Sequence, residues 1–310
     1  MTGAGLVRPP RLRPGDRVAV VAPSGPLVAE RLDRGLDVLR GWDLDPVVAP
    51  HARGTHRTLG HLAATDEERA RDLQEAWCDP SVRAVFAARG GYGAQRMVDL
   101  LDWDALRAAA PKPLVGFSDV TVLHEAFAVR AGVATLHGPA VAGEVFLKDD
   151  ATRDHLRRTL FAPETVRTLA SPSARPLVPG RARGVTFGGC LALLAAELGT
   201  PWARRGAAGG LLLLEDVGEP PYRIDRALTQ LLRAGWLDGV AGIVLGSWAR
   251  CGPYERVREV LVDRLAGLGV PVAEEFGFGH GESALTVPLG VAAELDATAG
   301  TLTFEAPATA

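Results

Sequence analysis

The chain has 310 residues, of which 47% are hydrophobic and 23% are charged, and its formal net charge is −3. This length corresponds to about two domains of ordinary size, and the composition is typical of a globular protein, not of a disordered chain or a small disulfide scaffold. The 34 basic and 37 acidic residues nearly balance, and no stretch shows a basic excess, so the sequence predicts no nucleic-acid partner.

The cysteines and the apolar segments indicate the compartment of the protein. Cys78, Cys190 and Cys251 lie far apart and form no CxxC or Cys/His spacing, so neither a disulfide framework nor a zinc site is predicted. No run of about 18 apolar residues marks a transmembrane helix. The apolar run 18–22 follows several arginines, as in a signal peptide, but a turn cluster interrupts it, and we interpret it as a buried strand. We therefore expect a cytoplasmic protein with no membrane partner.

The first half of the chain alternates short apolar strands with helical patterns. The predicted strands cover residues 17–23, 46–49, 84–88 and 114–117. The predicted helices cover residues 28–41, 65–77, 93–101 and 120–130. The helix at 65–77 begins with a capping box formed by Thr65 and Glu68. This alternation predicts an α/β fold in which helices cover both faces of a parallel sheet.

A proline-rich segment separates two predicted domains. Residues 163–183 contain four prolines and little periodicity, so we interpret 164–183 as a linker between an N-terminal domain, 1–163, and a C-terminal domain, 184–310. The elements predicted for the second domain are helices at 189–198, 224–234 and 255–265, and strands at 210–214, 242–246, 284–288, 291–295 and 301–304. We expect this domain to be smaller than the first and of mixed α/β type.

Ser118 is a candidate nucleophile because it stands between a predicted strand and a predicted helix. A serine at such a turn is displayed at the carboxyl edge of the sheet, beside backbone N–H groups that can stabilise an oxyanion. The alternative is that Ser118 only caps the helix, which is a common role for serine. The segment differs from the G-x-S-x-G motif, because Val120 stands where that motif has glycine.

The turn Arg89–Gly93 contains three glycines and follows a predicted strand directly. Glycines let backbone N–H groups approach an anion or oxyanion closely. The turn does not match G-x-G-x-x-G, and no P-loop lysine follows, so no dinucleotide cofactor is indicated. The alternative is a tight turn without a chemical role.

Two carboxylates and a late histidine could complete a catalytic set with Ser118. Glu215 and Asp216 end an apolar strand, and His280 lies in a glycine-rich loop. Ser118, Glu215 and His280 are together the residue types that acyl transfer requires. Adjacent strand residues point to opposite faces, so only one of the two carboxylates can reach His280, and the other could cap a turn. His137 is the rival for the role of base.

A cluster of histidines raises the possibility of a metal site. His51, His56 and His61 lie in one predicted loop, but the nearby carboxylates fall on the start of the next helix. We therefore predict no metal and no cofactor.

These segments, in this order, resemble the LD-carboxypeptidase family of serine peptidases, which includes the microcin C self-immunity peptidases. The resemblance spans nearly the whole chain. It is carried by residues 12–16, 18–23, 65–69, 89–93, 116–119, 137–139, 214–216, 219–226 and 279–280. It implies a flavodoxin- or Rossmann-like N-terminal domain and a smaller C-terminal domain, with the active site between them.

The resemblance also implies the roles of the site residues. Ser118 would be the nucleophile, with Glu215 and His280 as its partners, and backbone N–H groups of Asp119 and Gly91 would form the oxyanion hole. The implied enzyme is a metal-free cytoplasmic homodimer. The chain departs from the family pattern at position 190, where cysteine stands in place of the expected asparagine, which affects substrate contact or helix capping there.

Three functions are open at this point. The first is an LD-carboxypeptidase that removes D-alanine from a small peptide, the murein tetrapeptide, with Arg89 or the N–H groups of 90–93 anchoring the substrate carboxylate. The alternative within the family is an immunity-type peptidase that cleaves the amide between an aminoacyl or peptidyl group and a nucleotide analogue. The third, a ligand-binding module on a Rossmann-like sheet, leaves Ser118, Glu215 and His280 without a role.

Overall fold

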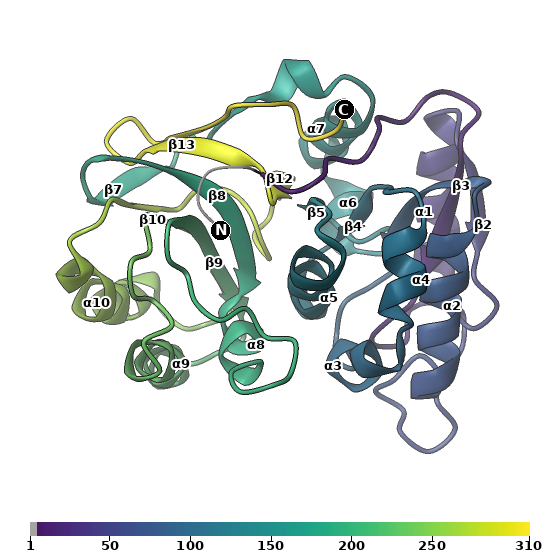
Figure 1. Ribbon diagram of the computed structural model, residues 1–310, viewed down its shortest axis with the longest axis horizontal. Helices are drawn as coiled ribbons and strands as arrows, with labels where there is room; N and C mark the ends of the chain where they lie inside the picture. Colours follow the sequence, from purple (N-terminus) through teal and green to yellow (C-terminus); the bar gives the residue numbers. More distant parts are fainter. Residues whose placement is uncertain (1–4) are drawn as a thin grey trace.

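Two β-sheets and the helices packed against them make up the structure, a computed structural model that describes residues 5–310 (Figure 1). The first sheet lies in the half of the molecule drawn mainly in purple and blue, and the second in the half drawn mainly in green and yellow. This arrangement confirms the predicted α/β fold with a second, mixed domain.

The first sheet has the strand order β12-β5-β4-β3-β1-β2. Its strands are β1 (Arg17–Val21), β2 (Asp45–Val48), β3 (Val82–Ala87), β4 (Leu114–Gly116), β5 (Thr135–His137) and β12 (Val287–Leu289). Strands β1 to β5 pair in parallel, as the alternation of strands and helices predicted, whereas β12 pairs antiparallel with β5.

Helices cover both faces of this sheet, because its strands are apolar on both sides. On β1, Ala19 and Val21 belong to one apolar cluster, and Val18 and Val20 belong to the other. The first cluster includes residues of α2 (Asp66–Cys78), α3 (Ala94–Met97), α4 (Trp103–Ala108) and α5 (Thr121–Ala126). The second includes residues of α1 (Ala29–Gly41), α6 (Glu144–Lys148) and α7 (Asp150–Phe161).

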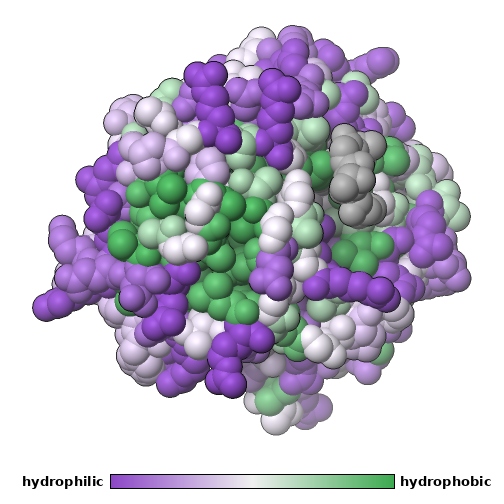
Figure 2. Space-filling model, turned by 60° about the vertical axis from the view of Figure 1, so that its left-hand side comes forward, coloured by the Kyte–Doolittle hydropathy of each residue, from purple (hydrophilic) through white to green (hydrophobic). Residues whose placement is uncertain are grey.

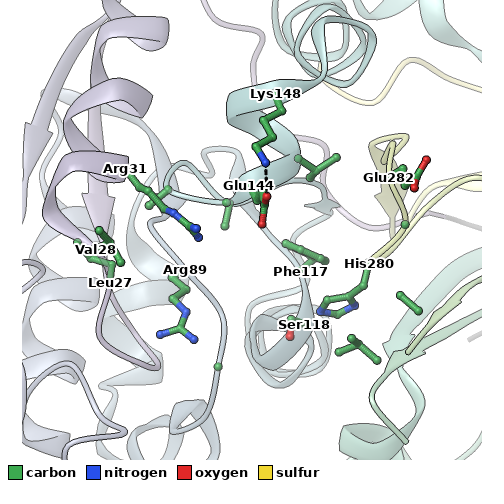
Figure 3. A pocket seen from close by; sticks show the side chains of 18 of the residues that line it. Leu27, Val28, Arg31, Arg89, Phe117, Ser118, Glu144, Lys148, His280 and Glu282 are labelled. Atoms are coloured by element: carbon green, nitrogen blue, oxygen red, sulfur yellow. Dashed lines mark hydrogen bonds and ion pairs between the residues drawn. The ribbon is translucent and has the colours of Figure 1, made fainter. Parts of the chain in front are cut away.

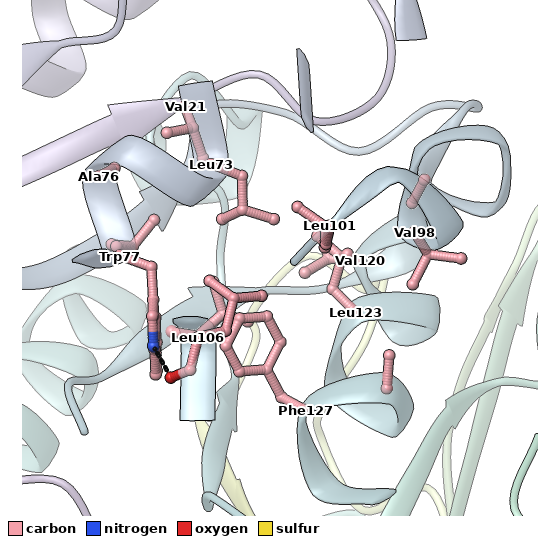
Figure 4. Packing of buried hydrophobic residues seen from close by; sticks show 14 of the residues in the cluster. Val21, Leu73, Ala76, Trp77, Val98, Leu101, Leu106, Val120, Leu123 and Phe127 are labelled. Atoms are coloured by element: carbon pink, nitrogen blue, oxygen red, sulfur yellow. Dashed lines mark hydrogen bonds between the residues drawn. The ribbon is translucent and has the colours of Figure 1, made fainter. Parts of the chain in front are cut away.

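Aromatic side chains fasten α5 within the first cluster (Figure 4). The ring of Phe127, directly after α5, meets the rings of Trp77 and Trp103 edge-on, with centroids 4.5 and 5.4 Å apart. Trp77 also donates a hydrogen bond from Nε1 to the Leu106 carbonyl, at 3.0 Å. Aromatic contacts of this size stabilise the position of α5, and with it the position of the turn that precedes this helix.

The second sheet has the strand order β6-β14-β13-β8-β9-β10-β11-β7. Its strands are β6 (Thr168–Ala170), β7 (Arg175–Val178), β8 (Arg181–Cys190), β9 (Gly210–Val217), β10 (Gly242–Ala249), β11 (Val272–Glu274), β13 (Ala292–Asp296) and β14 (Thr301–Phe304). Strands β8 to β11 pair in parallel and the outer strands pair antiparallel. Residues of α8 (Leu191–Ala196), α9 (Pro221–Arg233) and α10 (Tyr254–Leu265) pack together in one apolar cluster with this sheet.

The segment 164–183, which we interpreted as a linker, holds ordered structure. It contains β6 and β7, which form the two edges of the second sheet, and the start of β8. Pro176 lies within β7, and an edge strand tolerates proline because its outward N–H needs no partner in the sheet. Of the four prolines, Pro176 lies in an edge strand and the other three lie outside the strands.

Strand β12 belongs to a different sheet from the one expected. Residues 284–288 were predicted as a strand of the second domain, but the strand covers Val287–Leu289 and pairs with β5 of the first sheet. The chain thus enters the second sheet, returns to the first and enters the second again with β13.

The two sheets meet where α5 packs against the end of β8. A Cβ on Gly189 would lie only 2.5 Å from Thr121 Oγ1, so glycine is required for this approach. The Cys190 N–H donates to Thr121 Oγ1 at 3.0 Å, and the Gly188 N–H donates to Glu125 Oε1 at 3.3 Å. Cys190 in turn pairs with Glu215 on β9. These contacts bring the helix after Ser118 next to the strand that carries Glu215.

One face of the molecule carries a continuous hydrophobic area bordered by hydrophilic side chains (Figure 2). It lies on the side where Figure 1 shows β7 and α10. Within residues 5–310, none of the helices is both long enough and apolar enough to span a bilayer.

Candidate active site

Ser118 stands at a strained turn between β4 and α5. It begins the short 3-10 helix η2 (Ser118–Val120) with φ of +63°, a left-handed conformation that is unfavourable for a residue with a side chain. Two glycines make the turn possible: a Cβ on Gly90 would lie 2.8 Å from Ser118 Cβ, and one on Gly116 would lie 2.9 Å from Val120 Cγ1. Such strain is typical of functional sites.

Ser118 and His280 line the same cavity, which has a volume of about 1050 Å³ (Figure 3). The two side chains lie next to each other on its wall, and Phe117 packs on the imidazole with ring centroids 4.6 Å apart. No hydrogen bond joins Ser118 Oγ to His280 in the part of the chain that the structure describes. Catalytic hydrogen bonds of this kind often tighten only when substrate binds.

Glu215 contacts the His280 ring at Nδ1. Its Oε2 lies 2.6 Å from His280 Nδ1, and its side chain is fully buried. Burial opposes ionisation of this carboxyl group, but the charge and hydrogen bond of His280, together with the nearby His137, outweigh it and lower the pKa of Glu215 to about 2. With Nδ1 occupied, Nε2 is the nitrogen left for a hydroxyl group in the cavity.

Asp216 points away from His280, as the alternation of strand residues predicts. It accepts hydrogen bonds from the Ala192 N–H at 2.8 Å, at the start of α8, and from Cys190 Sγ at 3.2 Å. Burial raises the pKa of Asp216 to about 6. Asp216 therefore caps α8, and the thiol that replaces the expected asparagine contributes to the same group of hydrogen bonds.

His137, the rival base, is buried behind Glu215. Its ring is only 1% exposed, its Nε2 lies 3.9 Å from Glu215 Oε1, and it does not line the cavity. Glu215 thus stands between two histidines, and only His280 faces the space where a substrate can bind.

Two of the remaining histidines, His124 and His51, have hydrogen-bond partners within the fold. His124 Nε2 contacts the Gly116 carbonyl at 2.9 Å, and burial lowers the pKa of His124 to about 3. His51 Nδ1 lies 2.8 Å from Asp72 Oδ1. Across residues 5–310, no three His, Cys, Asp or Glu side chains are grouped so that they could hold a metal ion.

The glycine turn lies against Ser118 and against the loop after β1. Gly91 has φ of +110°, and a Cβ there would lie 3.3 Å from Gly25, so the two backbones touch. Arg89 donates a hydrogen bond from Nη1 to the Pro26 carbonyl, and its guanidinium group points into the cavity (Figure 3). Gly91 and Arg89 therefore both line the cavity that Ser118 lines.

The side chain of Asp119 has a structural position. Its Oδ2 accepts from the Ala94 N–H at 2.8 Å, and burial raises its pKa. It does not line the cavity. Only the backbone N–H of Asp119, in the first turn of η2, remains available for an oxyanion.

Arg69 supports the glycine turn and was not identified from the sequence as a functional residue. Its guanidinium is buried, donates to the Gly93 carbonyl at 2.9 Å and also donates to the Pro23 carbonyl. The sequence offered one signal for Arg69, its place in the family segment 65–69. A buried arginine needs several hydrogen-bond acceptors, and these become visible only in the structure. Arg69 thus ties the loop after β1 to the turn beside Ser118.

The low pKa of Glu215 predicts a defined loss of stability in acid. Its pKa of about 2 in the folded protein lies below the ordinary value of 4.5. Ionised Glu215 therefore favours the folded state at neutral pH by on the order of 3 kcal/mol, and this contribution is lost as the pH falls through 4.5 toward 2. Urea unfolding of the wild type and of Glu215→Gln measures this contribution to the free energy of unfolding. The difference between their unfolding free energies should narrow from about pH 6 to about pH 3, and a constant difference would contradict this assignment.

Comparison with known families gives matches over both halves of the chain. A family model described as the LD-carboxypeptidase N-terminal domain matches residues 18–138, and one described as the LD-carboxypeptidase C-terminal domain matches residues 183–295. A protein of Streptomyces coelicolor to which a carboxypeptidase activity is ascribed is 71% identical over 98% of this chain and 97% of its own length. The murein tetrapeptide carboxypeptidase of Pseudomonas aeruginosa is 34% identical over 90% of this chain and 93% of its own length.

Solved structures agree with these matches. The muramoyltetrapeptide carboxypeptidase from Oxalobacter formigenes has a TM-score of 0.78 and 31% identity, covering 93% of this chain and 97% of that one. The microcin immunity protein MccF, in complex with glutamyl sulfamoyl guanosine, has a TM-score of 0.84 and 22% identity, covering 98% and 99%. At 22% identity, the similarity to MccF shows a shared fold.

Proposed function

The chain belongs to the LD-carboxypeptidase family, and on that premise we propose that it is a serine peptidase that releases D-alanine from the murein tetrapeptide. The observation that carries this proposal is the contact of His280 with the buried Glu215, on the wall of a cavity that Ser118 also lines. This combination supplies a nucleophile, a base and a carboxylate that orients the base.

In the proposed reaction, Ser118 Oγ attacks the carbonyl carbon of the bond between the L-centre of a diamino acid and D-alanine. His280 Nε2 takes the hydroxyl proton, and Glu215 stabilises the imidazolium that forms. Backbone N–H groups of Asp119 and Gly91 donate to the oxyanion. His280 then gives its proton to the amine of D-alanine, which leaves, and a water molecule activated by His280 hydrolyses the acyl-enzyme.

The second candidate is the hydrolysis of an aminoacyl or peptidyl amide on a nucleotide analogue. The likeness of the whole fold to MccF supports it, because that protein was solved with a sulfamoyl nucleoside bound. The higher identity to the murein tetrapeptide carboxypeptidases favours the first candidate. Both reactions use the same acyl-transfer chemistry, so the products decide between them.

Substrate stereochemistry gives the test. The carboxylate and methyl group of a terminal D-residue occupy mirrored positions relative to an L-residue, so a pocket with a carboxylate anchor such as Arg89 accepts one hand only. We expect cleavage of the tetrapeptide that ends in D-alanine. For its L-alanine epimer and for the pentapeptide ending in D-Ala–D-Ala, we expect kcat/KM values lower by about 10²-fold or more, as misplacement of the carbonyl by an ångström causes. Mass spectrometry of the released products measures these rates.

Two outcomes would contradict this proposal. Comparable kcat/KM values for all three peptides would indicate a peptidase without LD specificity. Cleavage of an aminoacyl sulfamoyl adenosine, with none of the three peptides cleaved, would favour the second candidate.

We further propose that the protein acts in the cytoplasm as a homodimer, as its family resemblance implies. The hydrophobic area of Figure 2 supports a contact between copies, since large apolar areas on a surface are typical of interfaces.

A further inference from the structure

The cavity that Ser118 and His280 line is rich in positive charge. Its wall includes four cationic side chains and two carboxylates: Arg31, Arg89, Lys148, Arg250, Glu144 and Glu282. The chain as a whole has a net charge of −3, so the cavity has the opposite sign. An excess of one sign of charge in a cleft concentrates ligands of the other sign.

Arg31 and Arg250 reach this cavity from different halves of the molecule. Arg31 lies on α1, which packs on the first sheet, and Arg250 follows β10 of the second sheet. In Figure 3, Arg31 points into the cavity from the wall opposite Ser118, while Lys148 is paired with Glu144. Neither Arg31 nor Arg250 forms an ion pair with a carboxylate among residues 5–310.

Glu144 shows that these charges act on a common region. Its pKa is lowered first by the hydrogen bond and charge of Lys148, and then by the charges of Arg31 and Arg250. Since both guanidinium groups act on this one carboxylate, they are within electrostatic range of the same part of the cavity.

The backbone of Arg250 is held in an unfavourable conformation. Its φ of +58° is in the left-handed region, which costs energy for a long side chain. Of the residues that line the cavity, Ser118 is the other non-glycine residue with such a φ. Strained residues persist where the surrounding structure holds them, and they cluster at ligand-binding sites.

Arg89 differs in position from Arg31 and Arg250. Its guanidinium is held by Pro26 and lies 4.0 Å from where a Cβ on Gly91 would stand, so it lies beside the turn next to Ser118. The carboxylate of a single leaving alanine lies only a few bonds from the cleaved amide and needs an anchor at that position. A cavity of about 1050 Å³ also leaves room for a much larger acyl part.

We propose that Arg31 and Arg250 form a subsite for a second carboxylate, on the acyl side of the cleaved bond. The subsite rests on the proposed peptidase function and specifies its substrate as an acidic peptide. Two guanidinium groups can each donate paired N–H groups to a carboxylate, which makes the pair selective as well as attractive. An exposed single arginine would contribute little, so the pair acts together.

Two tetrapeptides that differ only by a carboxylate or a carboxamide on the acyl side test the subsite. The variants are Arg31→Gln, Arg250→Asn and the double variant, since asparagine tolerates the left-handed conformation. Arg34→Gln is the matched control, because Arg34 lies exposed on the same helix α1 and does not line the cavity. We expect the wild type and the control to prefer the carboxylate by about 10- to 100-fold in kcat/KM, mainly through KM. In the double variant this preference should fall to within about threefold.

Binding of the two tripeptide products, measured by calorimetry, separates this proposal from the proposed function. If the wild type binds both products equally, or if the double variant keeps the preference, the subsite is overturned even when the tetrapeptide is cleaved. If the wild type cleaves neither tetrapeptide but binds the acidic product more tightly through Arg31 and Arg250, the subsite stands and the peptidase function fails.

Discussion

Replacement of Ser118 by alanine should lower turnover of the tetrapeptide by about 10⁴- to 10⁶-fold, as the loss of a triad serine does in other hydrolases. The hydroxyl group is the only nucleophile that this proposal places beside His280, and alanine removes it while retaining Cβ. The variant should unfold at a temperature close to that of the wild type, because no described hydrogen bond depends on Ser118 Oγ. Single-turnover kinetics with mass detection, together with thermal unfolding, measure both effects.

Ser283→Ala is the control for this variant. Ser283 is exposed on the loop that carries His280 and does not line the cavity, so its removal should leave turnover within about twofold. Retention of more than about a tenth of the wild-type activity by Ser118→Ala would exclude Ser118 as the nucleophile. EDTA should have no effect on the wild type, and inactivation that zinc reverses would point to a metal-dependent reaction instead.

The second large effect on turnover is expected at the carboxylate of Glu215. Glu215→Gln should lower kcat by about 10⁴-fold, since it keeps the shape of the side chain but removes the charge that stabilises the imidazolium and selects its tautomer. The 2.6 Å contact with His280 and the full burial of Glu215 make this charge effective, because no solvent screens it.

Asp216→Asn is the paired comparison on the same strand. Asp216 caps α8 and bonds to Cys190, so its neutralisation should affect stability and leave kcat within about tenfold. A larger loss of kcat in Asp216→Asn than in Glu215→Gln, measured side by side, would show that the two carboxylates have exchanged roles.

Local signals in the sequence predicted much of the first domain. The capping box at Thr65 forms as expected, with the Glu68 N–H 3.2 Å from Thr65 Oγ1 and the Thr65 N–H 3.0 Å from Glu68 Oε2. Such a motif needs only neighbouring residues, so the sequence contains all the information for it. The alternation of strands with helices predicted the parallel sheet for the same reason.

Features that depend on distant pairing were not predictable in this way. Strand β12 has three residues, too few to show a period, and its partner β5 lies about 150 residues earlier in the chain. The edge strands β6 and β7 have only three and four residues, and Pro176 interrupts the strand pattern of β7. Assignment of a strand to a sheet requires the tertiary contacts, which propensity does not contain.

The candidate site also combines features that local sequence predicts with features that depend on distant contacts. Positions at strand ends pointed to Ser118 and Glu215, and a glycine-rich loop pointed to His280. The proximity of Ser118 to Glu215 follows from the close packing of Thr121 against Gly189. The cationic lining of the cavity had no local signal, because Arg31 and Arg250 lie far apart in the sequence and line the same cavity only through the fold.

The path of β12 has a consequence for the order in which the protein is assembled during synthesis. The first sheet receives its edge strand β12 only after residues 287–289 have left the ribosome, about 150 residues after its partner β5. His280 lies between β11 of the second sheet and β12 of the first, so its imidazole reaches Glu215 only when both sheets have formed. A nascent chain that already contains Ser118 therefore still lacks His280, the residue that we propose as its base.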